Sequence, residues 1–303
     1  MRHPVRRRGA GALGRWRAGA LAYAAAMTRR LLAVFAHPDD ESFGPGGTLA
    51  VHSAAGVDVH IAVLTDGVAG TPADGFPAGE ALAQVRRWEL RAAAEVLGAT
   101  LHHFDYHDSG FTGDARNQDP ASFINVDPAG PTADLVELIR RVRPDVVITH
   151  DENGSYHHPD HIRCHEITLA AFDAAGDPEL FPEAGSPFRP ARLYSETRSN
   201  RPMRFASAVL RLVGRDPTRM GVNRDVDMTR IGMDPARITT RVDVRAGWAT
   251  KRAAGARHVS QRGDIGPLRY APTWLLALLA PRELFIRERP PPWPGLREHS
   301  LFD

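Results

Sequence analysis

The stretch from Leu31 to Glu41 constrains the fold of this chain more than any other. An apolar run, Leu31 to Ala36, is followed at once by His37, Pro38 and three consecutive acidic residues. Such a run is typical of a strand buried on both faces of a parallel sheet. Pro38 lacks an N–H and favours an extended residue before it, so the strand is expected to end there. Ligands bind at the carboxyl ends of strands in open α/β sheets. The polar residues are therefore either a metal or acid–base site, or simply a charged loop.

Further along the chain, predicted strands alternate with predicted helices. Strands are predicted at residues 57–64, 100–104, 146–149, 192–195 and 238–244. Helices are predicted at residues 49–56, 79–97, 133–142 and 248–258, with Thr132 as the cap of the third. This alternation indicates an α/β fold with a mostly parallel sheet, flanked by helices and joined by right-handed crossovers.

A second polar cluster, Asp151 to His161, follows the strand predicted at 146–149. Pro159 suits the first turn of a helix, which places His158 at or beside the N-cap. His161 then lies about one helical turn further along, so both imidazoles can face the same crevice. Because two such clusters occupy equivalent strand ends, the sequence predicts a metal site between them.

We expect one domain over residues 29–289, with an irregular segment at 196–238 as an insertion that caps the substrate site. Residues 1–28 are expected to be a disordered basic tail or an over-extended start ahead of Met27, with an export signal as the alternative. Residues 290–303 are expected to be a proline-rich tail.

Composition argues against several functional classes. The sequence pI of about 9.0 is basic, but residues 1–26 contain six arginines and no acidic residue, so the formal charge of +2 falls to −4 without them. Nucleic-acid binding would then rest on the tail alone. Cys164 is the only cysteine, and no apolar run reaches membrane-spanning length. We therefore expect a cytoplasmic protein without a membrane span, and leave a homo-oligomer open.

Several motifs together resemble the LmbE-like (PIG-L) N-acetylglucosaminyl deacetylase family. The two clusters carry the resemblance, in the residues 36–41 and 158–161, and it extends over roughly residues 31–195. Similar stretches are 44–49, 65–67, 86–90 and 108–110. The resemblance implies a Rossmann-like fold and a zinc hydrolase that removes acetyl groups from amino sugars.

The zinc ligands implied by this resemblance are His37, Asp40 and His161. Two histidines and one carboxylate leave an open position on zinc for a substrate carbonyl, although the carboxylate would equally suit Fe²⁺. A His161–His165 pair is a second chemically possible arrangement, but it would leave His158 without a role.

The resemblance also implies catalytic roles. Asp39 corresponds to the general base, His158 to a protonated acid that acts on the oxyanion and the leaving amine, and Asp160 to the carboxylate that orients His158. Tyr156 corresponds to a mobile tyrosine that supports the tetrahedral intermediate. With Asp39 ionised and His158 protonated, the predicted pH profile is bell-shaped.

For substrate binding, the resemblance implies that Arg86 contacts hydroxyl groups and that Asp108 lines the sugar pocket. The alternative for Arg86 is an ion pair with Glu89 or Glu80 on its own helix. Glu41 is expected to be structural and to bond loop amides.

Three functions stay open at this point. The first is a zinc-dependent N-deacetylase for a small molecule that contains N-acetylglucosamine. The second is an amidase for a thiol conjugate or a secondary metabolite, where the arginines of residues 196–238 would favour an anionic substrate. The third is a non-catalytic Rossmann module, in which the glycines of residues 44–48 would bind a ligand phosphate.

Overall fold

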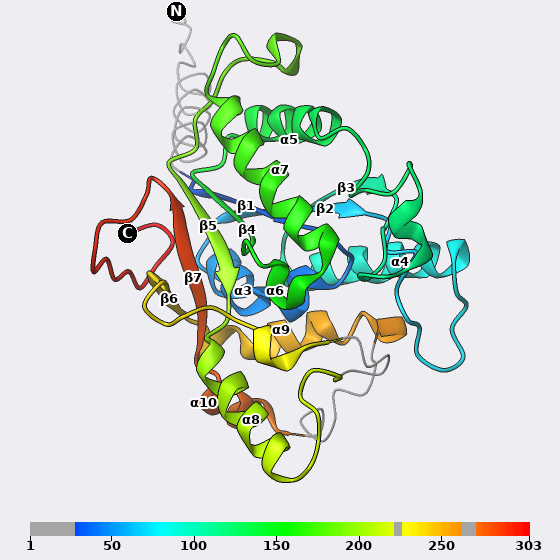
Figure 1. Cartoon of the computed structure of the whole chain (residues 1–303). Helices are drawn as coiled ribbons and strands as arrows, with labels where there is room; N and C mark the ends of the chain where they lie inside the picture. Colours follow the sequence, from blue (N-terminus) through cyan, green and yellow to red (C-terminus); the bar gives the residue numbers. More distant parts are fainter. Residues whose placement is uncertain (1–27, 221–225, 262–270) are drawn as a thin grey trace, which may run out of the picture.

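The computed structural model describes residues 28–220, 226–261 and 271–303 (Figure 1). These residues form a seven-stranded sheet in the order β3-β2-β1-β4-β5-β7-β6. The strands are β1 (Arg30–Phe35), β2 (Asp58–Thr65), β3 (Thr100–Tyr106), β4 (Val146–His150), β5 (Arg192–Thr197), β6 (Thr240–Asp243) and β7 (Arg282–Arg289). The pairings from β3 across to β5 are parallel, which confirms the predicted α/β class, whereas β7 is antiparallel to β5 and β6 is antiparallel to β7.

Helices cover both faces of the sheet. Their bounds are α2 (Asp40–Phe43), α3 (Gly46–Ala54), α4 (Glu80–Leu97), α5 (Ala129–Val142), α6 (Gly154–His157), α7 (Pro159–Ala175), α8 (Asn200–Leu212), α9 (Trp248–Gly255) and α10 (Thr273–Leu279). One core lies between the sheet and α3, α4 and α9, and the other lies between the sheet and α5 and α7 (Figure 1). Among the residues described, no helix is both long and apolar enough to cross a membrane.

Strand β1 lies in the middle of the sheet and contributes to both cores. Leu31, Ala33 and Phe35 pack into the first core, whereas Leu32 and Val34 pack into the second. All five side chains are at most 1% exposed. Two-sided burial explains why this strand is continuously apolar rather than alternating, and it fixes the position of the polar residues that follow.

One local prediction was wrong, and one strand was missed. Helix α5 begins at Ala129 with Pro128 at its N-cap, so Thr132 lies inside the helix instead of capping it. Pro131 is tolerated there because N–H groups in the first turn have no intrahelical acceptor. The antiparallel strand β7 was not predicted, because its apolar run, Leu284 to Ile286, is only three residues long and is flanked by charged residues.

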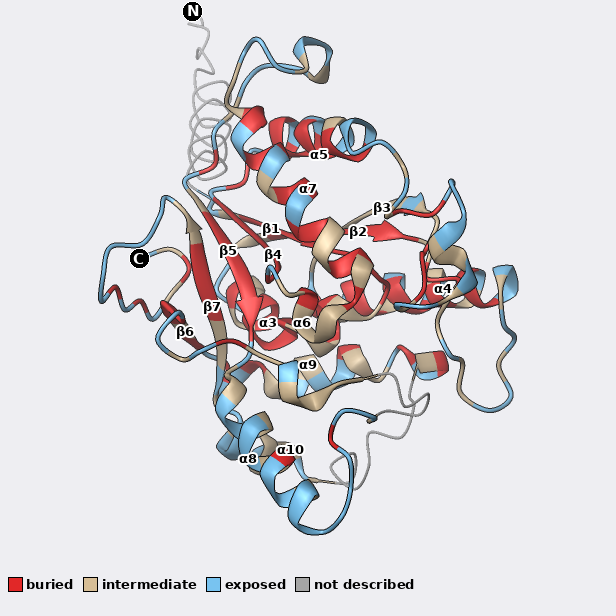
Figure 2. Ribbon diagram, viewed as in Figure 1, coloured by how far each residue is buried: buried red, intermediate tan, exposed pale blue. Residues whose placement is uncertain are grey.

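The proline-rich C-terminal segment, residues 290–303, is packed against the domain. Leu296 and Leu301 are buried. The carboxylate of Glu298 contacts three buried side chains: Arg287 at 2.9 Å, Thr240 at 2.8 Å and Tyr194 at 3.2 Å. Residues 290–303 therefore close the antiparallel edge of the sheet (Figure 2).

Replacing Glu298 with alanine is expected to lower the free energy of unfolding by about 3 kcal/mol, because Arg287 is left buried without its counter-charge. Urea denaturation measures this change. The matched control is Asp173→Ala, which removes the more exposed partner of Arg289 and should cost less than about 1 kcal/mol. Equal effects of the two substitutions would contradict a structural role for the C-terminal segment.

Candidate active site

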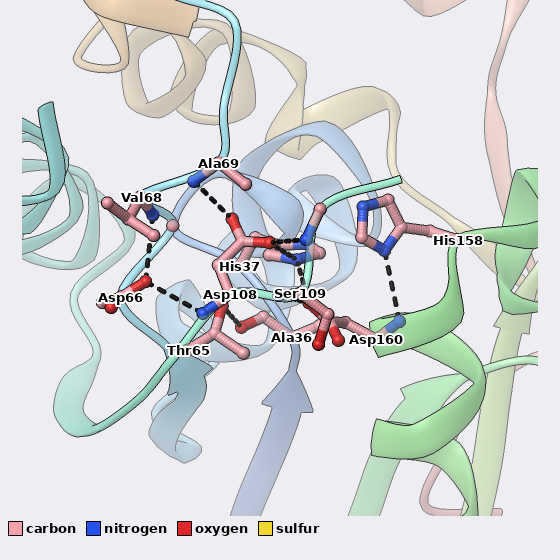
Figure 3. A network of polar contacts seen from close by, with 12 residues as sticks. Ala36, His37, Thr65, Asp66, Val68, Ala69, Asp108, Ser109, His158 and Asp160 are labelled. Atoms are coloured by element: carbon pink, nitrogen blue, oxygen red, sulfur yellow. Dashed lines mark hydrogen bonds and ion pairs between the residues drawn. The ribbon is translucent and has the colours of Figure 1, made fainter. Parts of the chain in front are cut away.

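The two polar clusters meet at the carboxyl edge of the parallel strands (Figure 3). β1 leads into His37 and then into α2, which begins at Asp40. β4 leads through α6 to His158, the N-cap of α7, and His161 lies in the first turn of that helix. The structure thus brings together residues separated by more than a hundred positions in the sequence.

Three side chains form a compact triangle of potential metal ligands. His37 Nδ1 lies 3.0 Å from His161 Nε2 and 3.5 Å from Asp40 Oδ2, and the last two atoms are 3.4 Å apart. Ligands at 2.0–2.2 Å from a tetrahedral zinc ion are separated by roughly 3.3–3.6 Å. The predicted triad therefore has nearly the spacing that a single tetrahedral cation requires.

The surroundings of this triangle are rich in carboxylates. His37 Nε2 lies 3.2 Å from Asp160 Oδ2 and 3.5 Å from Asp108 Oδ1 (Figure 3). Burial alone would lower the pKa of His37, but Asp108, Asp160 and Asp40 raise it well above its usual value. The site therefore favours positive charge, and a divalent cation bound by these ligands would take the place of that proton.

Asp160 does not orient His158 through its carboxylate, and this prediction was wrong. Its carboxylate accepts a hydrogen bond from Ser109 N–H at 2.9 Å and contacts His37. The Asp160 backbone N–H donates to His158 Nδ1 at 3.2 Å instead. The reason is helix capping: His158 is the N-cap residue, so its side chain accepts from the second residue of α7.

This contact assigns the tautomer of His158, because an Nδ1 that accepts a hydrogen bond leaves the proton on Nε2. Burial, together with His37 and His161, holds the pKa of His158 well below its usual value. The structure therefore favours a neutral imidazole with its proton on Nε2, whereas the sequence led us to expect a protonated one.

Asp39 lies beside the triangle but does not belong to it. Burial raises the pKa of its carboxyl to about 6, an effect that nearby Arg86 opposes. Arg86 Nη2 lies 3.2 Å from Asp39 Oδ2 and donates to the carbonyl of Pro38 at 2.6 Å, while its Nη1 donates to the carbonyl of Gly67 at 2.7 Å. Arg86 thus faces Asp39 and not Glu80 or Glu89, which were the alternatives considered from the sequence.

A cavity of about 450 Å³ opens onto this edge of the sheet. The residues predicted from the sequence that line it are His37, Asp39, Arg86, Asp108, Tyr156 and His158. Tyr156 stacks on Phe111, with ring centroids 6.0 Å apart. It lies between Ser155 and His157, which both have positive φ. The volume falls within the usual range for small-molecule sites.

With this geometry established, comparison with known proteins decides the family. Residues 32–172 match the family model described as PIG-L: GlcNAc-PI de-N-acetylase. The 1D-myo-inositol 2-acetamido-2-deoxy-alpha-D-glucopyranoside deacetylase of Thermobispora bispora is 38% identical over 244 residues, covering 77% of this chain and 79% of the relative. The enzyme of that name from Rhodococcus jostii is 37% identical over 250 residues, covering 77% and 82%. The chain belongs to the PIG-L family.

Solved structures agree on the fold. The N,N'-diacetylchitobiose deacetylase from Pyrococcus horikoshii superposes with a TM-score of 0.60 at 21% identity, covering 89% of this chain and 85% of that one. The 4-carboxy-2-hydroxymuconate hydratase GalB from Pseudomonas putida has a TM-score of 0.56 at 20% identity, covering 89% and 100%. Because a hydratase shares this fold with deacetylases, the fold alone does not define the reaction.

One site residue of this PIG-L protein was missed from the sequence. His150, the last residue of β4, accepts a hydrogen bond from Ala36 N–H through Nε2 at 3.1 Å, and its ring stacks on His161 with centroids 3.9 Å apart. Burial and His161 lower its pKa to about 3, so it is neutral. Its position at the carboxyl end of a predicted central strand was the signal that could have identified it.

The alternative ligand pair His161–His165 is not assembled. His165 Nδ1 bonds to the His150 carbonyl at 2.9 Å, and this residue belongs to none of the clusters of potential metal ligands among the described residues. Glu41, by contrast, bonds a loop amide as expected, because its Oε2 accepts from Asp39 N–H at 3.0 Å.

The glycine-rich loop does not offer a phosphate site. At the N-terminus of α3, the Glu283 carboxylate accepts from Gly47 N–H at 3.0 Å and from Thr48 N–H at 2.7 Å. A Cβ on Gly47 would come within 2.8 Å of both Glu283 Oε1 and Val244 Cβ. These amides are already paired with an anion of the protein itself, so the non-catalytic ligand-binding hypothesis loses its only support.

Proposed function

We propose that this PIG-L family member is a metal-dependent hydrolase that removes the acetyl group from the amide nitrogen of an N-acetylglucosamine-containing small molecule. The observation that carries the proposal is the triangle of His37, Asp40 and His161 beside a polar cavity that His37 lines together with Asp39 and His158. The names of the similar enzymes favour a GlcNAc-inositol as substrate.

In this proposal, His37, Asp40 and His161 hold Zn²⁺, with Fe²⁺ as the other metal that suits two histidines and one carboxylate. When bound, such a cation acidifies a coordinated water and polarises the amide carbonyl. Asp160 and Asp108 hold His37 from the side opposite His161, which fixes the direction in which its Nδ1 points.

The remaining residues handle protons and charge. Asp39, ionised and held by Arg86, accepts the proton of the attacking water and delivers it to the leaving nitrogen. His158 donates a hydrogen bond from its Nε2–H to the carbonyl oxygen as that oxygen gains negative charge. The hydroxyl of Tyr156 can donate a second hydrogen bond to the same oxygen. Arg86 and Asp108 stay our candidates for contacts with substrate hydroxyls, because both line the cavity.

The second hypothesis, an anionic amide substrate, receives no support from the arginine-rich segment. Among the described residues of 196–238, only Val226 lines the cavity. α8 carries its arginines on a largely exposed helix (Figure 2), and none of them lines the cavity. We therefore propose a neutral, hydroxylated substrate, and the capping role expected for 196–238 stays a prediction.

The pH profile of kcat/KM is expected to have an acidic limb at about pH 6, where Asp39 gains a proton. Activity requires the ionised carboxylate, so it falls about tenfold per pH unit below that point. No basic limb from His158 is expected, because its depressed pKa already makes it neutral. Acetate release measured from pH 4 to 9 checks this, and activity that stays constant down to pH 4 would contradict Asp39 as the base.

The proposal is tested by acetate release from a panel of amides: the GlcNAc-inositol, N,N'-diacetylchitobiose, free N-acetylglucosamine, and N-acetylglucosamine 6-phosphate as an anionic comparison. We expect the highest kcat/KM with the GlcNAc-inositol. Acetate release from none of the four, in protein loaded with Zn²⁺ or Fe²⁺, would refute the proposed substrate class.

A further inference from the structure

The backbone of Asp39 adopts a conformation that is unusual for a residue with a side chain. Its φ is 128° and its ψ is −24°. Such outliers cost about 1–3 kcal/mol and persist only where surrounding contacts hold them. One direct restraint is the hydrogen bond from Asp39 N–H to Glu41 Oε2, and the Asp39 carbonyl also accepts from the backbone N–H groups of Ser42 and Phe43. What fixes Glu41 therefore also helps to hold the backbone from which the Asp39 carboxylate reaches Arg86.

Glu41 is held from the distant end of the chain. Its Oε1 lies 2.7 Å from Nε2 of His258, a residue 217 positions away, and Ser42 Oγ donates to the same oxygen. Both Glu41 and His258 are fully buried. A buried carboxylate without a partner is strongly unfavourable, so the contact with His258 is what allows Glu41 to sit beneath Asp39.

The segment from His258 to Gln261 is itself anchored by a second buried carboxylate. Ser260 donates to Glu89 twice, from its backbone N–H at 2.8 Å and from its hydroxyl at 2.6 Å. The carbonyl of Ser260 accepts from Ala73 N–H at 2.7 Å. α4 and the loop after β2 thus fix this segment next to the cavity.

Gln261 follows Ser260 directly, so the contacts of Ser260 with Glu89 and Ala73 place Gln261 in the cavity wall. Its Nε2 donates to Ser260 Oγ at 3.2 Å. A Cβ on Gly70 would lie 2.9 Å from Gln261 Oε1 and 2.6 Å from Arg86 Nη1. The φ of Gly70 is not in the left-handed region, so glycine is needed here for space alone, to let the Gln261 amide and the Arg86 guanidinium approach the same rim.

We propose that His258 is a positioning residue that acts through Glu41 to hold Asp39 in its working conformation, and that the anchored segment presents Gln261 as a specificity-determining residue for substrate hydroxyls. The amide of Gln261 offers both a donor and an acceptor, as recognition of a hydroxyl requires. This inference rests on the proposed function, since it takes Asp39 to be the base.

His258→Phe removes the hydrogen bond to Glu41 and is expected to lower kcat about 10- to 100-fold, because small displacements of a catalytic group have effects of that size. KM and bound metal should stay at their wild-type values. His258→Gln keeps an N–H within reach of Glu41 and should recover most of the lost kcat. His52→Phe is the matched control, since it removes a buried histidine on α3 whose Nδ1 bonds the Thr48 carbonyl of its own helix.

A merely structural role would lower the melting temperature and the fraction of active protein without a rescue by glutamine. Wild-type kcat in His258→Phe, or equal losses in the phenylalanine and glutamine variants, would overturn the positioning role. If His258→Phe does not fold, Glu41→Gln and His258→Gln are compared in the same way.

The crystal structure of a folded His258 variant gives an independent answer: a displaced Asp39 carboxylate supports the inference and an unchanged one overturns it. This structural test of the Asp39 position applies even if the wild type releases no acetate, an outcome that would refute only the proposed function.

Gln261→Ala is expected to raise KM about tenfold for the sugar substrate, as loss of a hydrogen bond worth about 1.4 kcal/mol would do. The value of kcat should not change. N-methylacetamide, which has no hydroxyl groups, serves as the comparison substrate. An unchanged KM for the sugar, or an equal loss of kcat/KM with both substrates, would overturn the specificity role.

Discussion

Asp39→Asn is expected to reduce kcat for acetate release about 10²- to 10⁴-fold, the usual contribution of a general base. Asparagine has nearly the shape of aspartate, so the contact with Arg86 is weakened but the backbone bond to Glu41 stays in place. It cannot accept the proton from water. Since Asp39 lies outside the triangle of ligands, the metal content of the variant should equal that of the wild type.

Asp105→Asn provides a matched control for this experiment. Asp105 pairs with Arg87, the neighbour of Arg86 on α4, but on the more exposed side of that helix. Its positive φ is one that asparagine tolerates. We expect wild-type kcat for this variant. An Asp39→Asn enzyme that keeps more than about a tenth of wild-type kcat would contradict the assigned base.

His161→Ala is expected to abolish both metal binding and acetate release, with a loss of at least about 10³-fold in kcat/KM. It removes one corner of the triangle, and a catalytic zinc site needs three protein ligands to keep its geometry. Metal content measured on dialysed protein, together with acetate release, gives the result.

His165→Ala is the matched control, because His165 is also buried and lies one turn further along α7. We expect this variant to keep stoichiometric metal. Loss of metal from His165→Ala, with retention in His161→Ala, would reassign the ligand set.

The central part of the fold was predictable because its sequence signals are local. A two-sided buried strand is continuously apolar, and β1 and β4 both end where the polar residues begin. The same logic placed His37, Asp40 and His161 at one edge of the sheet, where the structure brings their ligand atoms to within 3.5 Å of one another.

Predictions failed where a contact depends on how elements pack. The carboxylate of Asp160 faces His37 because His158 is the N-cap residue of α7 and accepts a hydrogen bond from the Asp160 backbone N–H instead. Glu283 bonds the amides at the glycine-rich start of α3 because it lies on β7, which pairs antiparallel with β5. The local sequence did not indicate this strand. The pairing of Glu41 with His258 spans most of the chain, so neither residue carried a signal in its own neighbourhood.

The most direct test of the account is a metal titration of the apoprotein with the GlcNAc-inositol as substrate. Protein stripped of metal should release no acetate. Activity should rise linearly with added Zn²⁺ or Fe²⁺ and reach its plateau at one equivalent of the better metal, since the proposed triangle of ligands would hold a single cation. Full activity in metal-free protein, or no acetate release at any metal ratio, would contradict the account.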